Sequence, residues 1–257
     1  MSAAAPLLEV KGVTLQYRVG NVAVTATYRV DFNVEQSDRF VILGASGCGK
    51  SSLLKAVGGY LKPTEGSIKI GGRAINHPGA DRMMVFQEFD QLLPWKTVRQ
   101  NIVFPLLATR KLNAREADDK AMHYINLAGL ERVAESYPHM LSGGQKQRVA
   151  IVRGMAMEPE ILLMDEPFAA LDALTRQRMQ DELLALWDAS RFTVLFVTHS
   201  ISEAVKIGSR ILLLSPHPGQ VRAELNSLPR PQDPVASVAL QDKIHQLLFP
   251  GEETAQS

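Results

Sequence analysis

The segment Gly44-Ala45-Ser46-Gly47-Cys48-Gly49-Lys50-Ser51 constrains the fold of this chain more than any other feature. It fits the pattern G-x-x-x-x-G-K-[ST], in which glycines let backbone N–H groups curl around phosphates at the start of a helix. The apolar run from Phe40 to Leu43, directly before it, is typical of a buried strand. Strand, loop and helix in this order predict an α/β core in which Lys50 reaches the β- and γ-phosphates and the Ser51 hydroxyl binds Mg²⁺.

A second apolar run, Ile161 to Met164, ends in the carboxylates Asp165 and Glu166. This layout allows one acid to hold a metal and the other to act on water. Asp165 is expected to hold Mg²⁺, directly or through water, and Glu166 to act as the general base for the water that attacks the γ-phosphate. A strand that ends in Asp-Glu is more often an ordinary solvated strand end. Its occurrence in one chain with the phosphate loop favours catalysis.

The remaining patterns place this core in a larger α/β domain. Val194 to Val197 and Ile211 to Leu214 indicate two more buried strands. Alternating apolar and polar residues from Leu7 to Val34 predict antiparallel strands with one wet face. Between Pro94 and Pro159 the spacing is helical, for example over Ala114 to Leu127.

Composition excludes several classes of protein. With 257 residues, 46% of them hydrophobic, the chain can bury a substantial core. A net charge of +1 offers no general electrostatic basis for binding nucleic acid, and none is expected as a partner. The single cysteine, Cys48, cannot form a disulfide within the chain, and this composition agrees with a reducing cytoplasm. No apolar run approaches the roughly 18 to 20 residues of a membrane span, and Met1 to Pro6 lacks the features of a signal peptide.

The stretch Leu141-Ser142-Gly143-Gly144-Gln145-Lys146-Gln147-Arg148 predicts a second anion site, because Ser142 and two bare glycine amides begin a helix. It resembles the signature sequence of ATP-binding cassette (ABC) transporter ATPases, and the likeness extends over about Leu7 to Val221. The resemblance implies an ABC-type nucleotide-binding domain over residues 7–230, with a phosphate-loop core, an antiparallel β subdomain and a helical subdomain at about 88–160. Residues 231–257 are expected to form a short helix, near Ala239 to Phe249, and a tail. In the family the signature of one subunit covers ATP held by the other, which implies a head-to-tail dimer, expected to be a homodimer.

The resemblance also assigns roles to single residues. Gln87 resembles the glutamine that contacts metal and water and links catalysis to the membrane partner, His199 the switch histidine at the γ-phosphate, and Asp172 the aspartate that joins the two sites. Tyr17 resembles the aromatic that stacks on adenine, although Tyr28 is nearby and either ring could simply cover the sheet. The expected catalytic residues are Glu166, His199, Gln87 and Lys50, and the expected Mg²⁺ ligands are Ser51, Gln87 and Asp165. The expected ATP contacts are Tyr17, Gly44, Ala45, Ser46, Gly47, Cys48, Gly49, Lys50, Ser51, Ser52, Ser142, Gly143, Gly144, Gln145 and Asp172.

Finer features resemble the ATPases of nitrate, sulfonate and taurine importers. They are Pro78 to Arg82, Leu92 to Trp95, Phe168 to Arg176 and Pro218-Gly219. The resemblance implies a peripheral protein on the cytoplasmic face of the membrane. A membrane permease would bind the region Gln87 to Trp95, and a solute-binding protein would act indirectly. An exporter or lipid-extraction ATPase remains an alternative, as does a soluble ABC ATPase that acts on ribosomes or DNA.

Four positions depart from the usual pattern of this family. Ser37-Asp38 stands where Gly-Glu is common, and Ser200 where an aspartate often follows the histidine. Gly154 stands in the helix after the signature, where glycine costs about 1 kcal/mol relative to alanine. None of these positions is an expected phosphate contact, so catalysis is expected to survive.

Overall fold

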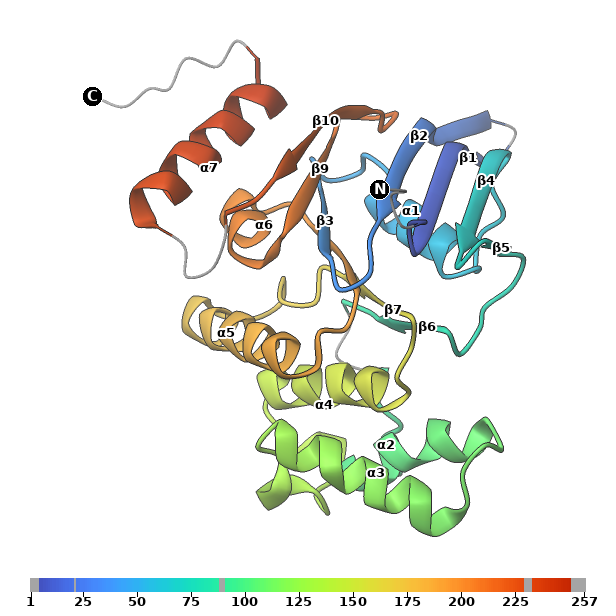
Figure 1. Cartoon of the computed structure of the whole chain (residues 1–257), viewed down its shortest axis with the longest axis vertical. Helices are drawn as coiled ribbons and strands as arrows, with labels where there is room; N and C mark the ends of the chain where they lie inside the picture. Colours follow the sequence, from blue (N-terminus) through green and yellow to red (C-terminus); the bar gives the residue numbers. More distant parts are fainter. Residues whose placement is uncertain (1–4, 21, 88–90, 229–232, 251–257) are drawn as a thin grey trace. The chain divides into compact units, whose positions relative to one another are not determined.

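The structure, a computed structural model, describes residues 5–20, 22–87, 91–228 and 233–250. The chain forms two compact units, the first built from Met1–Pro78 and Thr193–Ser257 and the second from Gly79–Phe192 (Figure 1). Over the residues described, none of the helices combines the length and the apolar character needed to span a bilayer.

The first unit contains an antiparallel sheet with the strand order β2-β1-β4-β5. Strand β1 (Leu8–Val19) pairs with β2 (Val22–Val34) and with β4 (Glu65–Ile70), and β5 (Arg73–Ala74) pairs with β4. The antiparallel strands predicted between Leu7 and Val34 are therefore confirmed.

The same unit contains a second, mixed set of strands in the order β10-β9-β3-β8. Strand β3 (Arg39–Leu43) runs parallel to β8 (Val194–Thr198) and β9 (Arg210–Leu214), and β10 (Val221–Asn226) is antiparallel to β9. All residues of β3 and β8 are buried, as the continuous apolar runs predicted. Helix α1 (Lys50–Val57) follows β3, and α6 (Ile201–Ile207) follows β8.

Helix α7 (Pro234–Leu248) packs against α6, β9 and β10 (Figure 1). It begins at Pro234, whereas the sequence analysis placed the helix near Ala239 to Phe249. The early start has a local cause, because the Asp233 side chain accepts a hydrogen bond from Val235 N at 3.0 Å and proline is favoured in the first turn. The predicted tail, from residue 251 on, lies outside the described residues.

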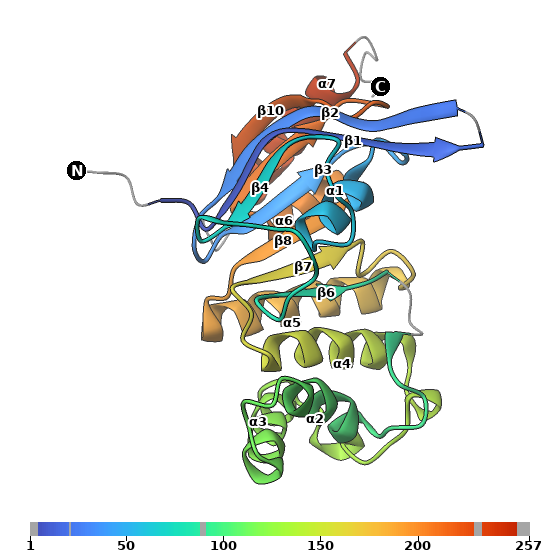
Figure 2. The same ribbon diagram turned by 90° about the vertical axis from the view of Figure 1, so that its right-hand side faces the viewer.

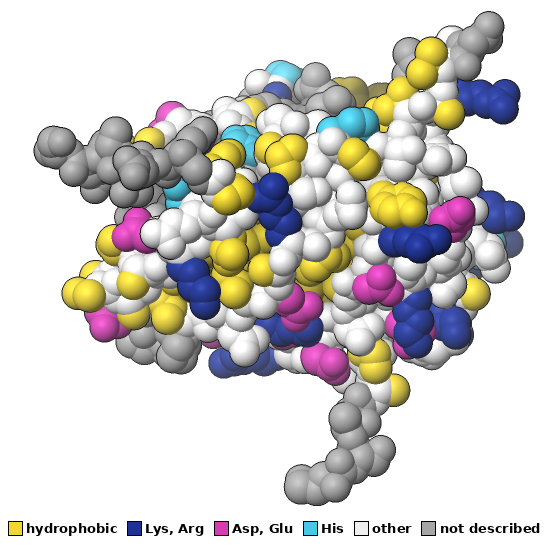
Figure 3. Space-filling model, turned by 90° about the horizontal axis from the view of Figure 1, so that it is seen from above, with side chains coloured by type: hydrophobic (Ala, Val, Ile, Leu, Met, Phe, Trp, Pro, Cys, Tyr) yellow, Lys and Arg dark blue, Asp and Glu magenta, His cyan; other side chains and the backbone are white. Residues whose placement is uncertain are grey.

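Figure 3 views the molecule from above. Lysine and arginine side chains on this face are scattered among acidic, apolar and uncharged ones. Over the part of this face that is described, they form no continuous basic surface.

The second unit combines two parallel strands with helices. Strand β6 (Arg82–Val85) runs parallel to β7 (Ile161–Asp165). The helices are α2 (Val98–Ala108), α3 (Ala114–Leu127), α4 (Gly143–Ala156) and α5 (Ala173–Ser190), with short 3₁₀ turns η2 (Glu131–Val133) and η3 (Pro138–Met140). Helix α4 lies between β6 and α5 on one side and α2 and α3 on the other (Figure 2). The helix predicted over Ala114 to Leu127 has those bounds.

Gly154 allows α4 to approach the strands closely. A Cβ atom at this position would lie 2.8 Å from Leu162 Cδ1, a separation that real side chains do not adopt. The close packing of helix on strand therefore explains a glycine in the middle of α4 that helix propensity alone disfavours.

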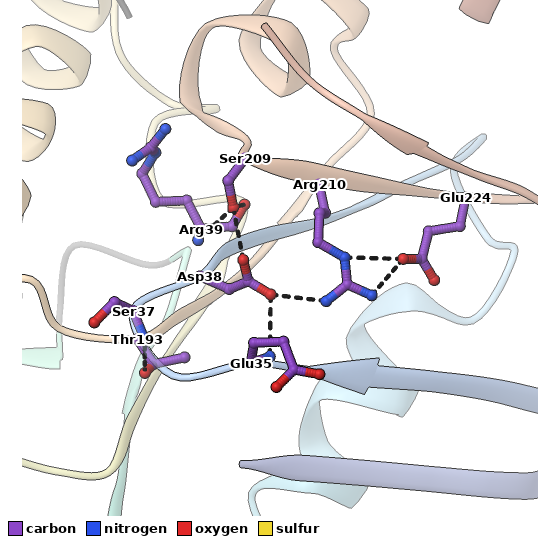
Figure 4. Close-up of polar contacts among 8 residues, drawn as sticks. All are labelled: Glu35, Ser37, Asp38, Arg39, Thr193, Ser209, Arg210 and Glu224. Atoms are coloured by element: carbon purple, nitrogen blue, oxygen red, sulfur yellow. Dashed lines mark hydrogen bonds and ion pairs between the residues drawn. The ribbon is translucent and has the colours of Figure 1, made fainter. Parts of the chain in front are cut away.

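Asp38, one of the departures from the family pattern, ties the turn between β2 and β3 to β9 (Figure 4). Its carboxylate accepts hydrogen bonds from Glu35 N at 3.0 Å, Ser209 Oγ at 3.1 Å and Arg210 Nη1 at 2.8 Å. Arg210 also pairs with Glu224 of β10. The preceding Ser37 has a φ of 63°, a left-handed conformation that explains why glycine is common there.

Replacing Asp38 with alanine should lower the free energy of unfolding by about 2–3 kcal/mol, since it removes an ionic hydrogen bond from a largely buried arginine. The free energy is measured by urea unfolding. The exposed Asp242, changed to alanine, serves as the control and should shift the value by less than about 0.5 kcal/mol. Equal effects of the two substitutions would contradict a stabilising role for this network.

Candidate active site

The phosphate-loop segment connects β3 to α1 in the first unit. Gly47 and Gly49 have φ values of 79° and 94°, which L side chains rarely adopt. A Cβ at Gly49 would also lie 2.5 Å from Ala26 O of β2. Ser46 and Gly47 are exposed while Cys48 is buried, so the loop has a solvent-facing front and a packed rear.

Lys50 folds back over the loop that precedes it. Its Nζ donates to the carbonyl oxygens of Gly44 and Ala45, both at 2.9 Å, and only 4% of the residue is exposed. The ammonium is thus held against the start of the loop. Ser51 and Ser52, in the first turn of α1, are half-buried.

His199 lies at the same sheet edge as the phosphate loop. Strands β3 and β8 pair in parallel with Leu43 opposite Thr198, so Gly44 and His199 each follow a paired residue at the carboxyl end of its strand. His199 is exposed. Ser200, where an aspartate is often found, caps α6 by accepting from Glu203 N at 3.3 Å, and serine and aspartate do this equally well.

Asp165, Glu166 and Gln87 share one strand edge in the second unit. Val85 of β6 lies opposite Met164 of β7, and these three residues follow at the carboxyl ends of the two strands. Asp165 is 8% exposed and Glu166 is half-buried. Glu166 has a φ of 43°, and its carbonyl accepts from Ala169 N at 3.1 Å in the turn that follows. A non-glycine residue held in this region is strained, and such strain is concentrated at functional sites.

The signature segment forms the beginning of α4, as predicted. Ser142 Oγ accepts from Gln145 N at 3.3 Å, and Gln145 Oε1 accepts from Ser142 N at 2.9 Å, which makes a capping box. Gly144 is buried, and a Cβ there would lie 2.8 Å from Thr175 Cγ2 of α5. The first turns of α4 and α5 are therefore in contact.

Asp172 is the residue that caps α5. Its carboxylate accepts a hydrogen bond from Thr175 N at 3.0 Å, and hydrogen bonds to Thr175 lower the pKa of this carboxyl. The side chain therefore stays ionised at neutral pH beside the contact between α4 and α5. The sequence analysis assigned Asp172 a role between subunits and did not predict that it caps a helix.

A polar network behind Gln87 was also missed. Gln91 donates from Nε2 to Phe86 O at 2.9 Å and accepts at Oε1 from Phe86 N at 3.2 Å. Gln147 of α4 is fully buried and donates to the same carbonyl at 3.4 Å, while Arg153 donates to Gln91 O at 2.8 Å. Burial lowers the pKa of Arg153. The backbone around the expected catalytic glutamine is thus fixed to the signature helix.

Tyr17 and Tyr28 are both partly exposed on the antiparallel sheet, at 50% and 40%. Tyr17 lies on β1, whereas the Tyr28 backbone on β2 donates to Gly219 O at 2.9 Å and its ring contacts Arg29. Exposure is compatible with stacking for either ring.

Replacing Tyr17 with alanine should weaken ATP binding about 5- to 150-fold, because stacking of a base on an aromatic ring contributes about 1–3 kcal/mol. Tyr28→Ala is the matched control and should leave the affinity within about twofold. Fluorescence titration with a labelled ATP analogue measures both. The reverse result would transfer the stacking role to Tyr28.

The chain is similar to known proteins of one family. Residues 28–169 match the family model described as ABC transporter. The chain is 47% identical over 203 residues to the taurine import ATP-binding protein TauB of Rhizobium johnstonii, covering 79% of this chain and 77% of that protein. It is 42% identical over 212 residues to the nitrate import ATP-binding protein NrtD of Synechococcus elongatus, covering 81% and 77%.

Among solved structures, the fold matches a dimeric ATP-binding cassette in a post-hydrolysis state bound to ADP and Pi. The TM-score is 0.72 at 33% identity, with 85% of this chain and 98% of that chain covered. The fold class predicted from the sequence is confirmed. The family model covers more than half of the chain and the relatives are similar over most of their length, so the chain belongs to the ABC transporter family as an ATP-binding subunit that hydrolyses ATP.

Proposed function

We propose that this chain is the ATPase of an importer for a small solute, of the nitrate, sulfonate or taurine type. The observation that carries the proposal is its similarity to the taurine import protein, 47% over 203 residues. The nitrate import protein supports the same class of solute. In this proposal the chain works at the cytoplasmic face of a membrane, together with a permease and a solute-binding protein.

The proposed chemistry gives each predicted catalytic residue one role. Glu166 takes a proton from water as the water oxygen attacks the γ-phosphorus, and the bond to the β-phosphate oxygen breaks to give ADP and phosphate. Lys50 balances charge on the β- and γ-phosphates, and His199 and Gln87 orient the γ-phosphate and the water. The start of α4 in a second copy of the chain, from Ser142 to Gly144, covers the γ-phosphate with its amides.

The residues expected to hold Mg²⁺ have suitable donors. Ser51, Gln87 and Asp165 offer hydroxyl, amide and carboxylate oxygens, the ligand class that Mg²⁺ prefers. No cluster of three or more His, Cys, Asp or Glu forms a metal site in the described part of the chain. This fits an ion that takes its other ligands from phosphates and water. When bound, Mg²⁺ would neutralise charge on the phosphate oxygens.

The surface proposed to bind the permease includes two exposed aromatic side chains. Trp95 is 69% exposed and Phe104, on α2, is 50% exposed. In this proposal the permease covers these two side chains and removes their apolar surface from water. The predicted region runs from Gln87 to Trp95, of which residues 88–90 lie outside the described residues. Residues 87 and 91–95 precede α2, and Trp95 provides the largest exposed apolar side chain among them.

The proposal is tested by tagging the chain in its native cell, solubilising the membranes gently and identifying the proteins that copurify. Recovery of a multi-helix permease with a solute-binding receptor is the expected result, and taurine, other sulfonates and nitrate are then titrated into the receptor. Recovery of ribosomes, DNA or an export complex instead would contradict the importer function and leave the ATPase activity standing.

Replacing Trp95 with alanine tests the proposed permease surface. The change should reduce permease recovery about tenfold or more, because buried tryptophans are commonly the residues that dominate an interface. Leu127→Ala removes another exposed apolar side chain of the same unit and should leave recovery unchanged. Equal recovery with both variants would place the permease elsewhere on the chain.

A further inference from the structure

The turn that joins β9 to β10 lies against the rear of the phosphate loop. It consists of residues 215–220, with the sequence Ser-Pro-His-Pro-Gly-Gln. The turn is closed by Ser215, whose N donates to Gln220 O at 2.8 Å and whose Oγ accepts from Gln220 N at 3.0 Å. The same hydroxyl has Pro216 O and Pro218 O within reach as acceptors, both at 3.1 Å, so it supplies a donor in a turn whose two prolines lack an N–H.

Gly219 connects this turn to strand β2. Its N donates to Ala26 O at 3.0 Å, and its carbonyl accepts from Tyr28 N at 2.9 Å. These two bonds form a parallel bridge opposite Thr27. Gly219 is therefore fixed in position by its backbone.

Gly219 also lies directly behind the phosphate loop. A Cβ at this position would lie 2.1 Å from Cys48 O and 3.3 Å from Cys48 C. The first distance is far inside van der Waals contact, and the atom it meets belongs to the backbone, so a side chain here could be accommodated only by moving the loop or the turn. Gly219 does not have the positive φ that would by itself require glycine. The contact with Cys48 is the constraint that excludes a side chain.

Two glycines of the phosphate loop itself are also closely packed. A Cβ at Gly49 would lie 2.5 Å from Ala26 O, and a Cβ at Gly44 would lie 3.1 Å from Leu214 O, at the start of the turn. The rear of the loop therefore rests on β2 and on the β9–β10 turn. Because phosphate binding depends on where the loop amides point, a displacement of this support is transmitted to the nucleotide.

We propose that Gly219 is a positioning residue for nucleotide binding, which acts by letting the β9–β10 turn support the Cys48–Gly49 peptide from behind. The inference rests on the proposed role of the phosphate loop in binding ATP. It predicts that one methyl group added at position 219, in the β9–β10 turn and outside the phosphate loop, weakens phosphate binding.

The test compares Gly219→Ala with the wild-type full-length chain in equilibrium titrations with ATP and with ADP. Both affinities should fall by the same factor, about tenfold or more, because the displaced amides face phosphates that the two nucleotides share. Gln220→Ala is the matched control, since this neighbouring side chain is exposed and the backbone bonds of Gln220 are kept. Its affinities should equal those of the wild type.

A second variant keeps the proposal testable if Gly219→Ala does not fold. Ser215→Ala adds no atom and removes the hydroxyl that closes the turn, so it should lower both affinities about threefold. Thermal unfolding without nucleotide separates a general loss of stability from a change in binding. If the wild type binds ATP and the folded variants bind both nucleotides as tightly as it does, the role proposed for Gly219 is wrong and the proposed function stands. A wild type that fails to bind ATP would overturn the proposed function instead.

Discussion

Replacing Glu166 with glutamine should reduce ATP hydrolysis about 100- to 10,000-fold while leaving ATP binding within about twofold, since general base catalysis contributes a factor of this size. Glutamine has nearly the same shape as glutamate, so the turn after β7 is preserved. It cannot accept a proton from the attacking water. Phosphate release at saturating ATP and Mg²⁺ measures hydrolysis, and titration with labelled ATP measures binding.

The same variant should accumulate as a dimer with ATP bound, because the nucleotides that join the two copies are no longer consumed. Size-exclusion chromatography with and without ATP measures this. Glu131→Gln is the control, as it makes the same chemical change at an exposed position. Rapid hydrolysis by Glu166→Gln would assign the base to another residue at the strand edge or to His199.

Local sequence patterns predicted the elements that carry the site. The phosphate-loop pattern correctly required a buried strand before it and a helix after it, and these are β3 and α1. Ser142 was expected to cap a helix, and the capping box of α4 confirms it. Such features are predictable because each depends on residues a few positions apart, whose backbone and side-chain chemistry is fixed by their type.

Contacts between distant parts of the chain could not be predicted in this way. Gln147 was visible in the signature motif, yet its complete burial and its bond to Phe86 depend on how α4 packs against β6. Gly219 was noticed only as part of a Pro-Gly pair, and its approach to Cys48 requires the three-dimensional path of the β9–β10 turn. The cap on α7 is different, because Asp233-Pro234 is itself a local signal for a helix start that the prediction overlooked.

Lys50→Ala should weaken binding of both ATP and ADP about 100-fold or more, because each ionic hydrogen bond to phosphate contributes about 1.5–3 kcal/mol. Lys50 is nearly buried and already lies against the loop through its bonds to Gly44 O and Ala45 O, so its ammonium needs little reorganisation to meet a phosphate. Isothermal titration calorimetry with each nucleotide measures the loss.

Lys55→Ala provides the matched control, since it removes a lysine from the same helix at an exposed position and should leave both affinities unchanged. The two variants together separate a specific phosphate contact from a general effect of charge. If long-range attraction were the cause, both would weaken binding and the loss would largely disappear at high salt. Retention of tight ATP binding by Lys50→Ala would show that the backbone amides and the first turn of α1 hold the phosphates without the ammonium, and would remove Lys50 from the binding site.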